Sequence, residues 1–426
     1  MRFTRRSLLR AAPAAALLPG VAPSARAAVA GSDRKVLFVL CFGGWDTGMI
    51  TTPMFDISGA TLEDGAERAD EGGLTWVSRP STRPSVDAFF TTHGQRTCIV
   101  NGFEVRSVTH ERCLRIVMTG STDATRDDWG AILAHEADDS LLFPHVVISG
   151  PAFTYDYTNR VVRVGGQGQL PDLLSGAALE ASELPVEPLP SELEAIQSAW
   201  LNKRVAAELD RALPGQPTAL LTEHLGVLER LDALTELGDL DLYADDAGCM
   251  RDLAEDAAVV FDCFEQGLSR CGMVMNEGWC TVGWDTHQNN GEMQDRHLEL
   301  LFGWLNDMID DLESRPGTAG GETLADEVTI VVLSEMGRHP VENTWGGKDH
   351  WTTTSALLIG AGVQGGQVIG QLDDAAAGEK VDLASGEVTD SGTALTAGHI
   401  GATILALGGA DPAEYLDEDP ISAALT

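Results

Sequence analysis

Carboxylates, imidazoles and one arginine are concentrated in the segment from Glu335 to His350. Glu335 and Arg338 are three residues apart, and Asp349 directly precedes His350. Oxygen and imidazole donors together are the ligands that hard or borderline divalent metals take in proteins. A surface ion pair and a chance Asp-His dipeptide would also give these residues, so this segment alone leaves both interpretations open.

Two further segments carry candidate metal ligands. Asp285 and His287 are two residues apart after an apolar run, and alternate residues of an extended strand end point the same way. The pair can therefore face one ion. Asp46 follows the apolar run 35–42 in a glycine-rich turn, where it can be a ligand at a strand end or an ordinary turn aspartate.

Thr109 and His110 stand at the start of a predicted helix. A hydroxyl there can cap the helix, which is the more frequent use of threonine in such a place. It can also be a nucleophile whose developing charge the helix N-terminus stabilises.

The elements that position these residues alternate between strands and helices. Continuous apolar runs indicate strands buried on both faces, and the alternation predicts a mainly parallel sheet between helices. The polar candidates follow strand ends, where open α/β sheets place their chemistry. The predicted strands are 35–42, 97–102, 143–148, 271–275, 328–333 and 356–360, and the predicted helices are 85–92, 113–118, 128–137, 298–312 and 399–407.

The remaining segments are predicted to form a loop and an inserted helical region. Residues 56–84 are expected to form a loop, and His297 is expected on the solvated face of its helix. From about 190 to 268 the pattern is helical and acidic without a strand signal, which predicts a helical insert. Seven cysteines without metal-site spacing include at least one that is unpaired.

The charge of the chain limits its partners. The 426 residues include 28 Lys and Arg against 65 Asp and Glu, a formal net charge of -37. Such a surface repels phosphate backbones and anionic lipids, which argues against nucleic-acid and membrane binding. An anionic substrate would need a locally positive centre, and a metal ion supplies one.

The N-terminus predicts export. Thr4 to Arg10 has the twin-arginine pattern, an Ala/Leu-rich run follows, and Ala25-Arg26-Ala27 is typical of a cleavage site. We therefore predict a signal peptide at 1–27, a mature domain at 28–426 and a periplasmic or extracellular location. The expected partner is the twin-arginine machinery, which exports folded proteins with their cofactors loaded. No later segment has the length and apolarity of a membrane span.

Several motifs together resemble a known family. With the twin-arginine start, they resemble the exported family called domain of unknown function 1501, within the alkaline-phosphatase/sulfatase-like superfamily, over nearly the whole mature chain. The motifs are Gly43-Gly44-Trp45-Asp46, Thr109-His110, Gly283-Trp284-Asp285-Thr286-His287, Ser334-Glu335-Met336-Gly337-Arg338 and Gly347-Lys348-Asp349-His350.

The resemblance implies a three-layer α/β/α sandwich with metal sites at the strand ends and a nucleophile between them. Thr109 falls at the position of the nucleophile, with His110 beside it, and Arg338 is predicted to hold an anionic group bidentately. Zinc is the expected ion, with manganese, magnesium and calcium as alternatives. The predicted ligands are Asp46, Asp285, His287, Glu335, Asp349 and His350.

Two functions from different classes follow. The first is a metal-dependent hydrolase of small phosphate or sulfate esters, in which the ion activates Thr109 or a water molecule. The alternative is a metal-stabilised binding or assembly protein on the same fold without catalysis, because a fold does not determine a function. A weaker third hypothesis gives the acidic helical insert a partner-binding role.

Overall fold

The computed structural model describes residues 29–138, 141–164, 190–212, 252–278 and 283–426. The predicted signal peptide and the middle of the predicted insert, residues 213–251, lie outside these ranges. So do Cys249 and Cys280. Cys41, Cys98, Cys113, Cys263 and Cys271 are buried free thiols.

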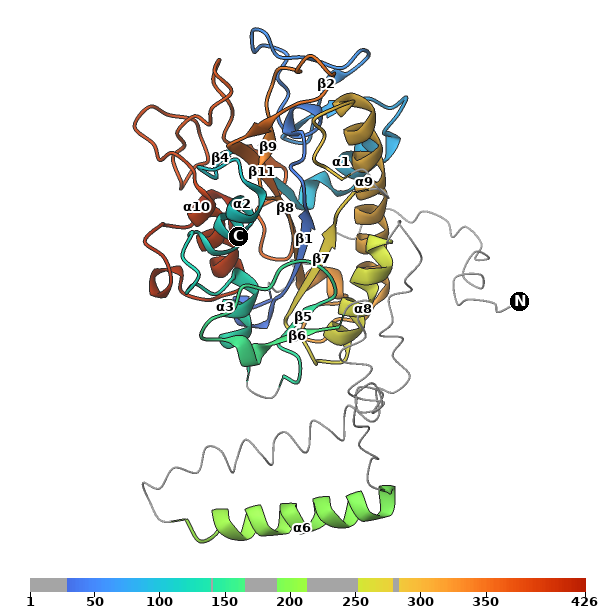
Figure 1. The fold of residues 1–426 in the computed structure, drawn as a ribbon, viewed down its shortest axis with the longest axis vertical. Helices are drawn as coiled ribbons and strands as arrows, with labels where there is room; N and C mark the ends of the chain where they lie inside the picture. The colour runs from blue at the N-terminus through green and yellow to red at the C-terminus, as the bar shows by residue number, and fades with distance from the viewer. Residues whose placement is uncertain (1–28, 139–140, 165–189, 213–251, 279–282) are drawn as a thin grey trace, which may run out of the picture.

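An eight-stranded sheet in the order β12-β4-β11-β8-β1-β7-β5-β6 forms the centre of the molecule (Figure 1). Among its described strands β11 alone runs antiparallel to its neighbours, β4 and β8. Its strands are β1 (Lys35–Cys41), β4 (Thr97–Glu104), β5 (His145–Val147), β6 (Val161–Arg163), β7 (Cys271–Asn276), β8 (Val328–Ser334), β11 (Thr353–Gly360) and β12 (Gln367–Ile369).

Helices cover both faces of this sheet (Figure 1). Along β1, Leu37 and Val39 join one core, whereas Val36, Phe38 and Leu40 join the other. This alternation follows from the two-residue period of a strand and explains the continuous apolar run. On the first face lie α1 (Pro84–His93), α8 (Leu253–Glu265) and α9 (Asn290–Ser314), and on the second lie α2 (His110–Thr119), α3 (Trp129–His135) and α10 (Ala397–Leu407). The predicted three-layer sandwich is confirmed.

Two local predictions were wrong. The stretch 56–84 contains a hairpin of β2 (Glu67–Glu71) and β3 (Leu74–Ser78) rather than only loop. His297 is buried, not solvated, because α9 extends toward its N-terminus well before the apolar stripe begins. Its ring packs 5.0 Å from that of Trp284, and its Nε2 lies 3.3 Å from the carbonyl oxygen of Gly283.

The described parts of the predicted insert are helical. The helix α6 (Ser191–Leu209) lies within its range, and α8 packs against both α9 and β7. The boundaries of an insert stay a prediction. Within the described residues, no helix combines the length and apolarity needed to cross a membrane.

Candidate metal centre

The candidate residues meet at one edge of the sheet, where β1, β4, β7 and β8 end and β11 begins. His110 opens α2 after β4, and Glu335 directly follows β8. Asp285 and His287 lie between β7 and α9. His350 belongs to β10 (His350–Trp351), which pairs with β9 (Gly337–Arg338) so that His350 lies opposite Arg338. Parallel strands ending at a common edge therefore bring distant segments together, as the sequence predicted.

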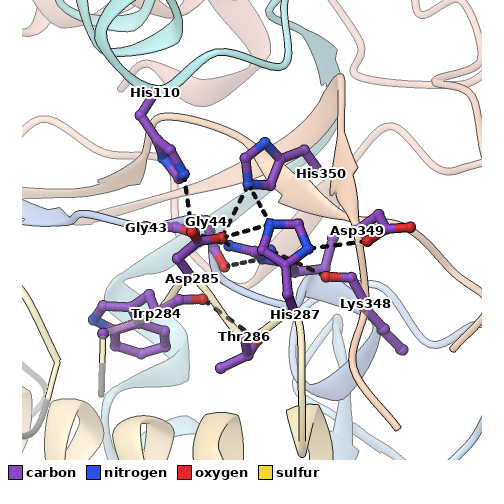
Figure 2. A network of polar contacts seen from close by, with 12 residues as sticks. Gly43, Gly44, His110, Trp284, Asp285, Thr286, His287, Lys348, Asp349 and His350 are labelled. Carbon is purple, nitrogen blue, oxygen red and sulfur yellow. Dashed lines mark hydrogen bonds and ion pairs between the residues drawn. The ribbon is translucent and has the colours of Figure 1, made fainter. Parts of the chain in front are cut away.

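Asp285 lies at the middle of three imidazole rings (Figure 2). Its Oδ1 is 2.9 Å from Nε2 of His350 and 3.2 Å from Nε2 of His287. Its Oδ2 is 3.4 Å from Nε2 of His110. One ligand atom from each of His110, Asp285 and His350 lies within 4.8 Å of the others. The Nε2 atoms of His287 and His350 are 3.0 Å apart.

The other nitrogen of each ring faces an acceptor. Nδ1 of His350 lies 2.7 Å from the carbonyl oxygen of Val108, to which it can only donate. Nδ1 of His110 lies 2.7 Å from Oε1 of Glu335, and Nδ1 of His287 lies 2.9 Å from Oδ1 of Asp349. This is the outer-shell arrangement that leaves Nε2 as a metal donor.

The contact between His287 and His350 shows whether the histidines and Asp285 are arranged as metal ligands would be. With both Nδ1 atoms protonated, two neutral rings would direct their Nε2 lone pairs at one another across 3.0 Å. That contact is repulsive unless a proton or a cation lies between the nitrogens. The donor set of imidazoles and a carboxylate therefore fits a divalent cation.

The electrostatics agree with a cation site. Burial alone would raise the pKa of Asp285, but hydrogen bonds from His110, His350 and Arg338 outweigh burial and hold this pKa below its ordinary range. The carboxylates of Asp285 and Glu335 raise the pKa of His110 to about 9 against the opposing effect of burial. A permanently ionised carboxylate thus faces the three rings.

The pH dependence of metal affinity tests His110 as a ligand. In the metal-free protein His110 is protonated at neutral pH, since its pKa is about 9. An ion bound at Nε2 must displace that proton, so we expect affinity to rise about tenfold per pH unit from pH 7 toward 9. Zn²⁺ titration against a competing chelator measures this slope. His110→Gln should flatten it, and an unchanged slope in that variant would mean that another group loses the proton.

Glu335 and Asp349, both predicted as ligands, lie behind histidines rather than in the cluster. Glu335 is fully buried, and both of its oxygens accept the backbone N–H of Gly43. Ser334 Oγ also lies 3.2 Å from Oε2 of Glu335. Asp349 accepts from Asn343 as well as from His287. Both carboxylates therefore orient imidazoles in this structure.

Arg338 is buried, and the protein supplies an acceptor for each of its three guanidinium nitrogens. Nη2 donates to Oδ1 of Asp285 at 2.6 Å and also to the carbonyl oxygen of Gly43. Nε donates to Gly44 O at 2.9 Å, and Nη1 donates to Lys348 O at 3.1 Å. In this geometry Arg338 supports Asp285, and its bidentate contact with an anionic group stays a prediction.

Two further predicted residues are not brought into the cluster. Asp46 is fully buried, with its Oδ2 2.8 Å from Nζ of Lys348 and 2.7 Å from Nδ2 of Asn290. Thr109 is exposed beside His110, at the N-cap of α2, but its side chain makes no capping bond.

Sequence reasoning missed three contributors to the site. Val108 supplies its carbonyl oxygen, and Lys348 supplies the cation on Asp46. Gly347 passes so close to His287 that a Cβ would lie 1.9 Å from its carbonyl carbon. Gly347 and Lys348 directly precede Asp349-His350, and this position was the one available sign of their roles. Their position in the sequence does not indicate that they contact His287 and Asp46.

A family model matches residues 239–412. Its description is "Protein of unknown function (DUF1501)", and the matched range includes Asp285, His287 and His350 but neither Asp46 nor His110. No curated protein matches the chain.

Solved structures align with most of the chain at low identity. The C-terminal periplasmic domain of EcEptC from Escherichia coli has a TM-score of 0.42 and 9% identity, covering 93% of this chain and 90% of that one. PsFucS1 sulfatase from Pseudoalteromonas sp. has a TM-score of 0.40 and 12% identity, covering 92% and 72%. The phosphonate monoester hydrolase of Agrobacterium radiobacter has a TM-score of 0.35 and 10% identity, covering 91% and 78%.

Proposed function

We propose that this protein is an exported, metal-dependent hydrolase of phosphate or sulfate esters, of the family called domain of unknown function 1501. The observation that supports the metal centre best is the common orientation of three imidazoles. His110, His287 and His350 turn Nε2 toward Asp285 while each Nδ1 faces an acceptor. Twin-arginine export of the folded, loaded protein is part of the proposal.

Zinc is the ion that this donor set favours. Imidazole nitrogen suits zinc and other borderline metals, whereas calcium and magnesium prefer sites made of oxygen. Three nitrogens and one carboxylate are offered by His110, His287, His350 and Asp285. Manganese remains the alternative that accepts more oxygen ligands.

A bound ion would supply Lewis-acid polarisation of an ester oxygen and local positive charge. The chain's own residues hold the centre in place: Arg338 fixes Asp285, and Glu335 fixes His110. Thr109 is the proposed nucleophile, since it precedes His110 at the N-terminus of α2, where negative charge is favoured. In a chain with net charge -37, a bound ion would supply the local attraction that an anionic ester needs, since the surrounding surface repels it.

An ester screen with the zinc-loaded protein tests this function. The panel contains chromogenic phosphate and sulfate monoesters and phosphodiesters, assayed with metal content measured in the same samples. We expect Thr109→Ala to reduce turnover about 100-fold or more while zinc is retained. Thr122→Ala, which removes another exposed threonine, should change nothing.

The possible outcomes separate the alternatives. Turnover that survives in Thr109→Ala would assign the attack to water instead of the hydroxyl. A fully loaded protein that cleaves no member of the panel would contradict the hydrolase and fit the binding role.

A further inference from the structure

A buried ion pair lies beside the candidate metal centre. Nζ of Lys348 is 2.8 Å from Oδ2 of Asp46, and their side chains are 4% and 0% exposed. Asp46 follows β1. Lys348 directly precedes Asp349, and both are labelled in Figure 2. The pair therefore joins the end of a central strand to a segment that carries two residues of the site.

The surroundings of Asp46 account for its charge without a metal ion. Besides Lys348, Asn290 Nδ2 donates to Oδ2 at 2.7 Å, and the backbone N–H of Gly48 donates to Oδ1 at 3.1 Å. Its own backbone N–H donates to Oε1 of Gln294. A buried carboxylate needs a counter-charge and donors, and here the protein supplies both.

The backbone of Lys348 links two segments that bear ligands. Its N–H donates at 3.0 Å to the carbonyl oxygen of Thr286, the residue between Asp285 and His287. Its carbonyl oxygen accepts at 3.1 Å from Nη1 of Arg338, whose Nη2 holds Asp285. A shift of Lys348 would therefore be transmitted directly to the ligand-bearing segments on either side.

We propose that Lys348 is a positioning residue for the metal centre. Its ammonium binds Asp46 in place of a second cation, so that the centre takes a single ion. The same bond fixes the segment leading to His350 against the segment of Asp285 and His287. This inference rests on the metal site of the proposed function but not on ester hydrolysis.

A second buried pair provides a matched control. Nζ of Lys35 is also 2.8 Å from a carboxylate, Oε2 of Glu327, with side chains 8% and 0% exposed. Lys35 opens β1, so this pair lies at the opposite end of the strand from the metal centre. A purely structural role for Lys348 predicts that the two pairs behave alike.

Cobalt(II) titration of the metal-stripped full chain tests the inference. We expect the wild type to bind one equivalent. Lys348→Met should bind at least about tenfold more weakly and show an altered visible absorption spectrum, although Lys348 offers no ligand atom. Lys35→Met should unfold at lower denaturant yet keep the wild-type affinity and spectrum. If Lys348→Met does not fold, the charge-neutral Asp46→Asn, Lys348→Met variant is titrated instead, with the same expected weakening.

Distinct results would overturn the inference. Wild-type affinity and spectrum in the Lys348 variants would leave the metal site intact and reduce Lys348 to an ordinary ion pair. Two equivalents in the wild type, with one lost in Asp46→Asn, would make Asp46 a ligand. No cobalt bound by the wild type would overturn both the metal site and this inference, whereas metal binding without turnover would contradict only the hydrolase.

Discussion

Asp285→Ala is expected to abolish stoichiometric metal binding. Asp285 is the group that all three imidazoles approach, within 2.9 to 3.4 Å. Its loss removes the negative charge between the rings, and the resulting drop in metal affinity should exceed the 10- to about 100-fold drop typical of outer-shell substitutions. A variant that cannot bind the ion also loses the stabilisation that binding confers, about 2.7 kcal/mol at a metal concentration 100 times Kd.

Plasma mass spectrometry of the folded protein and thermal melts with and without chelator measure these effects. The wild type should lose melting temperature on chelation, and Asp285→Ala should not respond. Asp374→Ala, which removes an exposed aspartate elsewhere, should behave as wild type. Asp349→Asn should weaken binding by a smaller factor, because Asp349 lies against Nδ1 of His287 and not against the Nε2 that faces the cluster. Full metal content in Asp285→Ala would place the ion at a different site.

Arg338→Met is expected to lower both the free energy of unfolding and the metal affinity. The substitution leaves the carbonyl oxygens of Gly43 and Lys348 without a buried donor, at about 1–3 kcal/mol for each unsatisfied group, whereas Gly44 O keeps the donor Nε2 of Gln294. It also frees Asp285 from its 2.6 Å partner. We therefore expect a loss of about 3 kcal/mol or more. Arg338→Lys should not restore it, since an ammonium cannot reproduce the fork of a guanidinium.

Urea unfolding and metal titration of the same variants check this prediction. Arg68 offers a matched control, because its contact with Asp56 is also 2.6 Å but the two side chains are 42% and 82% exposed. Arg68→Met should cost no more than about 1 kcal/mol and leave metal binding unchanged. If Arg338→Met unfolds at the wild-type urea concentration, the buried network around Gly43 contributes nothing to stability.

Much of the fold was predictable because strands buried on both faces consist almost entirely of apolar residues. The strands β1 and β8 are buried at every position and are apolar except at Lys35, Thr329 and Ser334. Their carboxyl ends then pointed to the correct edge of the sheet. The antiparallel direction of β11 could not be predicted, because an apolar run does not show which way a strand runs relative to its neighbours. One of its two partners, β4, is also more than 200 residues away in the sequence.

The sequence was less informative about which residues of the site face the cluster and which lie behind a histidine. Asp285, His287 and His350 were predicted as ligands from their residue types at strand ends, and the structure brings them together. His110 was predicted to lie beside a nucleophile and was not among the predicted ligands. Its contact with Asp285 depends on how α2 begins against the sheet, which the sequence did not show. The outer position of Glu335 depends on the N–H of Gly43, which is 292 residues away. The sequence around Glu335 does not indicate a hydrogen bond to so distant a residue.

The wide separation of the ligands along the chain also bears on the order of assembly. Asp285 and His350 are 65 residues apart, and Glu335 supports His110 across 225 residues. Only the Asp285–His287 pair is local, so an unfolded chain offers the ion a weak, two-point chelate. A zinc finger gains metal as it folds, whereas here β4, β7, β8 and β11 must associate before the coordination sphere exists. An occupied centre would thus indicate a completed sheet, which is the state that the proposed twin-arginine export of the folded protein would require.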